Sequence, residues 1–218
     1  MFIGHFGAAL AAKPFAPRAS LGTLIAAAQL VDLVWPVLLL LGAERVIIRP
    51  GDTAFTPLEF VSYPWTHSLL MVLAWAALFG VVYRARTHDL RGAWVIAALV
   101  VSHWVLDFVT HRPDLPLAFG ATKVGLGLWN SRPGTIAVEG ALFSAGVYLY
   151  ARTTQPRNRR GRWALVGLVV LLVALYFANQ GPPPPSPTAI GVVGLFGALF
   201  IPWGAWIDRN RFVRPVTD

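Results

Sequence analysis

Cysteine is absent from the 218 residues, and charged side chains are scarce. Without cysteine the chain has neither a disulfide framework nor a thiolate metal site, so any metal must be held by histidine, carboxylate or backbone oxygen. Charged residues make up 13% of the chain, against about 25% in a soluble domain. No polar stretch is long enough to form a second domain, and no internal repeat is visible.

Hydrophobic residues make up 56% of the chain and gather in runs of about 20, the length that a helix needs to cross a bilayer. The sequence therefore predicts an all-α, polytopic membrane helical bundle with about six transmembrane helices and a short N-terminal half-helix, all within a single membrane domain over 1–218. We expect the half-helix at 1–12, spans at 20–41, 64–83, 92–111, 133–151, 163–179 and 188–206, and outer loops at 42–63 and 112–132.

Two local features refine this arrangement. Trp35-Pro36 is expected to kink the outer end of the first span, because proline removes a helical hydrogen bond. Arg49-Pro50-Gly51-Asp52 is typical of a turn between two short extended pieces. The loop that contains this turn is a candidate lid over a site in the bundle.

The distribution of basic residues predicts the orientation. Thirteen of the 18 lysines and arginines fall on one side if Lys13, Arg18, the loops 84–91 and 152–162 and the tail after Trp206 face the same way. By the positive-inside rule that side, with the C-terminus, is cytoplasmic. The formal charge of +8 is then a feature of topology and needs no nucleic acid. The composition suits a multi-pass protein of the bacterial inner (plasma) membrane.

One predicted span carries ionisable residues in a row. His103, Asp107 and His111 are spaced i, i+4, i+8, so a helix projects all three from one face. Such side chains cost several kcal/mol in hydrocarbon and are rarely kept without a partner, which makes an intramembrane row a candidate functional site. The plainer interpretation is a core histidine that forms a hydrogen bond to Asp107.

Other polar residues fall at a similar depth. At about 1.5 Å per helical residue, His67, Glu139 and Asp32 lie in the same layer, in the outer half of the bundle, and the half-helix can bring His5 there. Because several carboxylates together would repel one another, one or two divalent ions would offset their charge. Zinc is the first candidate, with manganese, iron or magnesium as alternatives. The predicted metal ligands are His5, Asp32, His67, His103 and Asp107.

The remaining candidate residues are predicted to transfer protons or to bind the substrate. His111 and Glu139 are predicted to transfer protons; His111 alternatively is a second ligand or a mere helix end, and Glu139 a structural partner of Arg132 or Arg112. Arg112, Lys123 and Arg132 are the outer basic residues nearest the row and are candidates to bind a phosphate headgroup, since arginine suits bidentate phosphate contacts. The alternative for each is interfacial snorkelling.

At these residues the chain resembles a family of bacterial inner-membrane metal-dependent hydrolases, sometimes described as LexA-binding. That family carries an early His, an Asp, a Thr-His-Ser and a His-x-x-x-Asp, which match His5, Asp32, Thr66-His67-Ser68 and His103/Asp107. The pattern is also distantly similar to part of the metal-ligand pattern of zinc-dependent phospholipase C. The chain has Tyr63-Pro64-Trp65 where the family often has His-Arg. The resemblance covers residues 1–111 and implies a metal-dependent hydrolase.

Together these features predict a membrane-embedded metal-dependent hydrolase that acts on a phosphoester of a lipid or lipid-like substrate from the outer side of the membrane. Membrane lipid is the predicted partner, and the sequence indicates no oligomeric state. The alternatives are an ion, proton or metal transporter, a phosphatase of the phosphatidic-acid type, and a non-enzymatic membrane protein with a structural metal site. A transporter predicts polar residues continuing to the cytoplasmic side, where the spans are almost wholly apolar.

Overall fold

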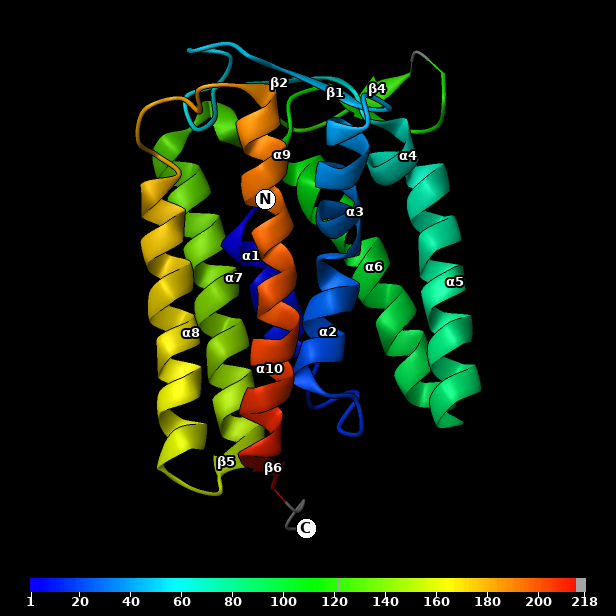
Figure 1. The fold of residues 1–218 in the computed structure, drawn as a ribbon, viewed down its shortest axis with the longest axis vertical. Coiled ribbons are helices and arrows are strands. Elements are labelled where there is room, and N and C mark those ends of the chain that lie inside the picture. Colours follow the sequence, from blue (N-terminus) through cyan, green and yellow to red (C-terminus); the bar gives the residue numbers. More distant parts are fainter. Residues whose placement is uncertain (121, 215–218) are drawn as a thin grey trace.

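The computed structural model describes residues 1–120 and 122–214 and shows a bundle of helices along one long axis (Figure 1). Strand pairs close both ends, β1–β2 and β3–β4 at one end and β5–β6 at the other. We call these the hairpin end and the basic end. The helices are α1 (Ile3–Ala11), α2 (Leu21–Ala28), α3 (Leu30–Leu40), α4 (Pro64–His67), α5 (Leu69–Thr87), α6 (Leu90–Thr110), α7 (Arg132–Thr153), α8 (Arg159–Ala178), α9 (Pro187–Leu195) and α10 (Phe200–Arg209).

The prediction of a membrane helical bundle is confirmed at the level of its helices. Among the described residues, five segments are long and apolar enough to cross a membrane, namely α5, α6, α7, α8 and the continuous segment Pro187–Arg209. The bent pair α2 and α3 passes the same test as one unit. The predicted basic loop 152–162 is shorter than expected, because α7 runs to Thr153 and α8 already begins at Arg159.

The first predicted span bends at a different place from the one expected. α2 and α3 meet at 55°, and the residue between them is Gln29, with φ −106° and ψ 5°. Pro36 stays inside α3 and lies against α9, where a Cβ on Gly194 would touch its ring. The expected kink at Trp35-Pro36 does not interrupt the helix, because α3 continues through Pro36 to Leu40. The break in this span falls at Gln29 instead, next to Ala28, whose carbonyl contacts His103 as described below.

The second predicted span is also interrupted. Ser68 has an extended backbone, with ψ 143°, and separates the short α4 from α5. Its hydroxyl accepts a hydrogen bond from the amide of Met71 and so caps α5, which is the usual role of serine at a helix start. The break leaves His67 as the last residue of α4.

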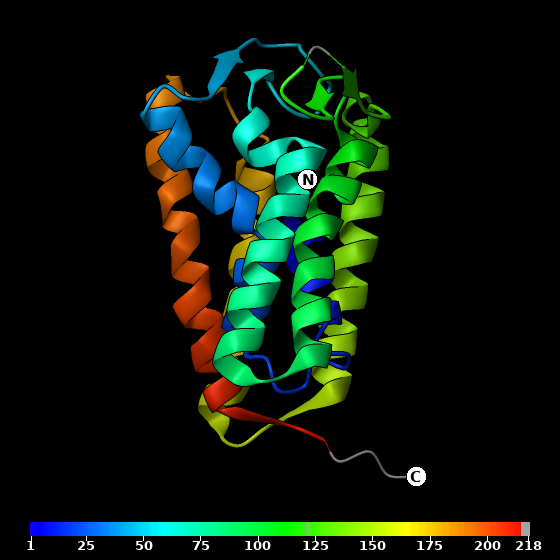
Figure 2. The same cartoon turned by 90° about the vertical axis from the view of Figure 1, so that its right-hand side faces the viewer.

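The predicted half-helix is confirmed as α1, which lies inside the bundle beside α7 (Figures 1 and 2). Its contact with α7 depends on two glycines, since a Cβ on Gly146 would meet the backbone of Gly7. Ile3, Phe6 and Leu10 are buried. α1 therefore brings His5 into the centre of the molecule.

The predicted turn and its extended pieces are confirmed at the hairpin end. β1 (Arg45–Ile48) pairs antiparallel with β2 (Leu58–Ser62), and the amide of Asp52 closes a turn on the carbonyl of Arg49, 3.0 Å away. The second outer loop forms β3 (Leu115–Pro116), β4 (Lys123–Val124) and the 3₁₀ helix η1 (Leu128–Asn130). Both hairpins lie over the ends of the helices (Figure 2).

The remaining short elements complete the last span and the basic end. The 3₁₀ helix η2 (Phe196–Leu199) joins α9 to α10. The strands β5 (Thr154–Pro156) and β6 (Arg211–Val213) pair antiparallel.

Candidate metal centre

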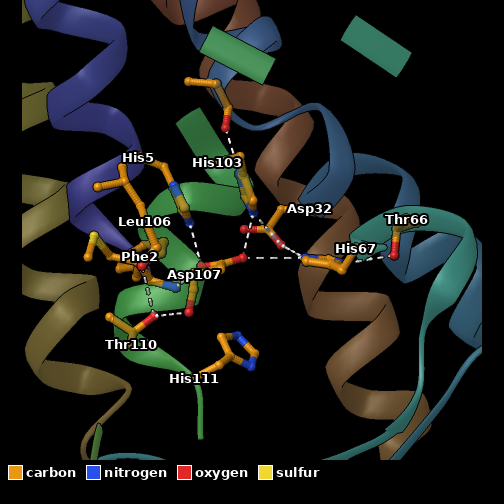
Figure 3. Close-up of polar contacts among 12 residues, drawn as sticks. Phe2, His5, Asp32, Thr66, His67, His103, Leu106, Asp107, Thr110 and His111 are labelled. Atoms are coloured by element: carbon orange, nitrogen blue, oxygen red, sulfur yellow. Dashed lines mark hydrogen bonds and ion pairs between the residues drawn. The ribbon is translucent and has the colours of Figure 1, made fainter. Parts of the chain in front are cut away.

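Four helices bring five predicted ligands together (Figure 3). His5 comes from α1, Asp32 from α3, His67 from the end of α4, and His103 and Asp107 from α6. They form two overlapping groups, His5/His103/Asp107 and Asp32/His67/His103, within each of which the ligand atoms lie no more than 4.8 Å apart. Buried histidine and aspartate groups that could hold a metal ion are therefore present, as the sequence predicted.

The tightest part of the cluster alternates imidazole and carboxylate. Nε2 of His103 lies 3.1 Å from Oδ2 of Asp107 and 3.6 Å from Oδ1 of Asp32. Nε2 of His67 lies 3.2 Å from the same oxygen of Asp32 and 3.8 Å from Oδ2 of Asp107. Two nitrogens and two oxygens thus face one another in a ring.

The nitrogen–oxygen spacings are those expected between neighbouring donor atoms around one ion, although the two groups with mutually close ligand atoms each contain three residues. Zinc binds histidine nitrogen and carboxylate oxygen at about 2.0–2.2 Å in a tetrahedron, whose donor atoms are then about 3.3–3.5 Å apart. The four measured nitrogen–oxygen separations run from 3.1 to 3.8 Å. The donor set also contains only nitrogen and oxygen, which suits zinc, manganese or iron.

The far nitrogen of each imidazole is held by the protein. Nδ1 of His103 lies 2.7 Å from the carbonyl of Ala28, which can only accept a hydrogen bond. Nδ1 of His67 lies 2.7 Å from the hydroxyl of Thr66, and that hydroxyl gives its one hydrogen to Oε2 of Glu44, 2.7 Å away. Both Nδ1 atoms must therefore donate these hydrogen bonds. Histidines that bind a metal through one ring nitrogen usually donate a hydrogen bond from the other in the same way.

With Nδ1 protonated, the neutral form of each ring presents the lone pair of Nε2 to the carboxylates. Nε2 of His103 has no hydrogen-bond partner among the residues that the structure describes, although the oxygens of Asp32 and Asp107 are close to it. Lone pairs facing carboxylates repel one another unless a cation lies between them. The arrangement therefore needs either extra protons or a metal ion.

His5 contacts a different part of Asp107. Its Nε2 lies 3.1 Å from Oδ1, which also accepts from the amino group of Met1 at 2.5 Å. The His5 ring stacks on that of His103 with centroids 3.6 Å apart. Asp107 thus uses Oδ1 toward α1 and Oδ2 toward His103 and His67, so His5 orients the carboxylate from the side away from the ring of four donors.

Access to the cluster lies on the side of Asp32. The side chains of His5, His67, His103 and Asp107 are at most 5% exposed, whereas that of Asp32 is 36% exposed. A groove of about 780 Å³ between α1, α5, α6 and α7 lies apart from the cluster: the described residues that line it are apolar or small, and none of them is ionisable.

The structure separates His111 from the predicted row. α6 ends at Thr110, and His111 has ψ 145°, so its ring leaves the helical face. Nδ1 lies 2.9 Å from Oδ1 of Asp114 and 3.3 Å from the hydroxyl of Tyr63. Burial lowers the pKa of His111, although the bond to Asp114 acts in the opposite direction. His111 is in neither metal-binding group.

Glu139 is also used elsewhere. Its Oε2 accepts hydrogen bonds from the amides of Phe2 and Gly4, at 2.8 and 3.2 Å, at the start of α1. Carboxylates are favourable there because the amides at a helix N-terminus lack partners within the helix. The predicted alternative, a bridge to Arg132 or Arg112, does not form in the described part of the chain. Glu139 is in neither metal-binding group.

The three basic candidates contact protein acceptors. Arg112 pairs with Asp52 at 2.8 Å and with Asp114 at 3.3 Å, and so ties the β1–β2 hairpin to the end of α6. Lys123 donates to the carbonyl of Val61 at 3.0 Å. Arg132 donates to the side chain of Gln180 at 2.8 Å. Each of these contacts competes with a role in binding substrate.

Sequence reasoning missed the residues that hold His67. Glu44 is 1% exposed, and besides the Thr66 hydroxyl it accepts from the Thr66 amide at 2.9 Å. Burial raises the pKa of Glu44, and the bonds from Thr66 offset part of this effect. Glu44 precedes β1 in a loop that looks polar and exposed in the sequence, and no periodicity links it to position 66.

Comparison of this chain with protein-family models, with curated proteins and with solved structures finds no match.

Proposed function

We propose that this protein is a membrane-embedded, metal-dependent hydrolase whose ion is held by His67, His103, Asp32 and Asp107. The observation that carries the proposal is the ring of two imidazole nitrogens and two carboxylate oxygens at 3.1 to 3.8 Å, with the outer nitrogen of both histidines already donating. Zinc is the first candidate for the ion. The resemblance of these positions to the bacterial metal-dependent hydrolases supports the same reaction class.

The residues around the ion have separate roles in holding the ligands and in admitting substrate. A divalent ion supplies Lewis acidity, which polarises a phosphoryl oxygen and lowers the pKa of water. Glu44 and Thr66 hold His67, and the Ala28 carbonyl holds His103, so that both rings keep a fixed orientation. His5 orients Asp107. Asp32, the exposed member of the set, marks the side from which substrate arrives.

His111 is our candidate for proton transfer. Tyr63 donates to Asp114 at 3.2 Å, and Asp114 accepts from Nδ1 of His111, which leaves Nε2 of that ring as the basic nitrogen. We assign Glu139 a structural role in place of proton transfer: it accepts hydrogen bonds from the amides at the start of α1. The proposed substrate is a phosphoester of a lipid, and the proposed location of the site is the outer half of a bacterial inner membrane.

The first test is metal content. Full-length protein purified in a neutral detergent is expected to contain about one equivalent of zinc, manganese or iron by inductively coupled plasma mass spectrometry. Asp107→Asn should lose the metal, whereas Asp114→Asn, which removes a buried carboxylate outside the donor set, should keep it. Folded wild-type protein that lacks metal and does not take up added ions would contradict the proposal.

The second test is hydrolysis. Metal-loaded protein is assayed on bis(p-nitrophenyl) phosphate and on phosphatidylcholine in mixed micelles, beside protein treated with a chelator. The proposal predicts turnover that chelation abolishes and that the missing ion restores. His103→Gln should lower turnover by at least a hundredfold.

A structural metal is the second candidate, because four protein donors are typical of closed structural zinc sites. It predicts the same metal content and the same loss in Asp107→Asn, but no hydrolysis. Removal of the ion should then lower the midpoint of thermal unfolding by many degrees, with no activity to lose. The hydrolysis assays on metal-loaded protein therefore separate the two candidates.

A further inference from the structure

A polar cavity lies at the basic end, where β5 and β6 lie at the opposite end of the bundle from the two hairpins (Figure 1). Its volume is about 450 Å³, and its walls come from three segments that are distant in sequence: the connection before α2, strand β5, and the end of α10 with β6. The function proposed above makes no use of it.

The walls carry an excess of positive charge. Five basic residues line the cavity, against the single carboxylate of Asp208: Lys13, Arg18, Arg157, Arg209 and Arg211. Asp208 is itself engaged, since one of its oxygens lies 2.5 Å from Nζ of Lys13 and the other accepts from the hydroxyl of Tyr150 at 2.5 Å. Within the described residues, none of the four arginines forms an ion pair with a carboxylate of its own.

Arg211 is the most informative of them. It is 6% exposed, and it donates to neutral acceptors, the hydroxyl of Thr154 at 2.9 Å and the carbonyl of Gly161 at 3.1 Å. It forms no ion pair with a carboxylate within the described residues. A buried charge is costly unless a counter-charge accompanies it; burial lowers the pKa of Arg211, and Tyr150 and Asp208, which is already paired with Lys13, offset only part of this effect. A bound anion would supply the missing charge.

The surroundings indicate the kind of anion. Trp163 and Trp206, near the same end, are 60% and 44% exposed, as is typical of tryptophans at a membrane–water interface. Basic pockets between helices at that level suit phosphate headgroups, and guanidinium groups match phosphate oxygens in pairs. We propose that this cavity binds a phosphate group, carried either by an anionic membrane lipid or by a free phosphate compound.

The test uses the full chain in a neutral detergent and follows the midpoint of thermal unfolding during titration with phosphatidylglycerol, phosphatidylcholine or inorganic phosphate. We expect a saturable rise with phosphatidylglycerol or with inorganic phosphate and none with phosphatidylcholine. A response to phosphatidylglycerol alone assigns the site to lipid. A response to inorganic phosphate assigns it to free phosphate compounds.

The variant Arg18→Gln/Arg209→Gln tests the cavity itself. Both residues are exposed, and neither donates a hydrogen bond within the described chain, so the variant keeps the fold. The apparent affinity should fall at least tenfold. The matched control, Arg84→Gln/Arg86→Gln, removes two exposed charges from the last turn of α5 and should change it less than twofold. Equal losses in both variants, or the absence of any shift specific for anions, would overturn the proposal.

Discussion

The imidazole of His67 is held by a hydroxyl, and the hydroxyl by a buried carboxylate. Each member depends on the next: Glu44 takes the hydrogen of Thr66, and Thr66 can then only accept from His67. This fixes the tautomer of a proposed ligand without placing a second charge against the ring. The amide of Thr66 also donates to Glu44, so the chain of contacts is rigid at both ends.

Thr66→Val should break this chain at its centre while keeping the shape of the side chain. It leaves Oε2 of Glu44 without its donor, which we expect to cost about 1–3 kcal/mol in the free energy of unfolding. It also frees the ring of His67, and metal affinity should fall by about 10–100-fold, as for other partners of metal ligands. Chelator competition and thermal unfolding measure the two effects.

The control is Ser102→Ala, which deletes a hydroxyl next to His103 that, in the described part of the chain, donates to the carbonyl of Leu99 alone. It should leave the metal affinity unchanged. Equal affinities in wild type and Thr66→Val would show that His67 is not a ligand or that Thr66 does not position it.

Among the elements, the short helix α1 positions a residue of the cluster, because it places His5 against Asp107. It is only nine residues long, yet it carries His5 to Asp107 and is held by Glu139 at its start. Its close approach to α7 requires glycine, because a Cβ on Gly146 would clash with the carbonyl of Gly7. The two helix interruptions are equally important, since Gln29 frees a carbonyl for His103 and Ser68 ends α4 at His67.

Gly146→Ala should therefore push α1 away from α7. We expect a loss of about 1–3 kcal/mol in stability, the usual cost of overpacking, together with weaker metal binding as His5 moves away from Asp107. Gly140→Ala is the matched control on the same helix, because nothing lies within 4 Å of a Cβ there; it should be neutral or slightly stabilising. Thermal unfolding and metal titration of both variants check the prediction.

At the scale of the whole molecule, charge divides the two ends. The basic end carries 13 of the 18 lysines and arginines, while the hairpin end contains the network in which Arg112 joins Asp52 and Asp114. By the positive-inside rule we expect the basic end in the cytoplasm and the hairpin end outside.

The absence of cysteine makes this orientation directly measurable. Single cysteines are introduced at two exposed positions, Ala54→Cys in the hairpin and Ala85→Cys near the end of α5. A membrane-impermeant maleimide should label the first in intact bacterial cells with a permeable outer membrane and the second only after the inner membrane is opened. The reverse pattern would place the metal centre on the cytoplasmic side.

The sequence by itself indicated a membrane helical protein and named all four of the proposed ligands. Long apolar runs predict membrane helices because the bilayer leaves backbone groups no partner outside the helix. Ionisable residues in those runs are conspicuous for the same reason, and the i, i+4 spacing of His103 and Asp107 places both on one face.

Only the tertiary structure decided which of these residues meet and what holds them. Glu44 reaches Thr66 because the β1–β2 hairpin, in which Arg45 pairs with Ser62, brings the start of α4 back beside the residue that precedes β1. No local sequence pattern connects the two positions. His111 and Glu139, which the sequence predicts to transfer protons, instead contact Asp114 and the start of α1. The break between α2 and α3 likewise falls at Gln29, where no local pattern marks it, while α3 continues through Pro36 and packs against α9.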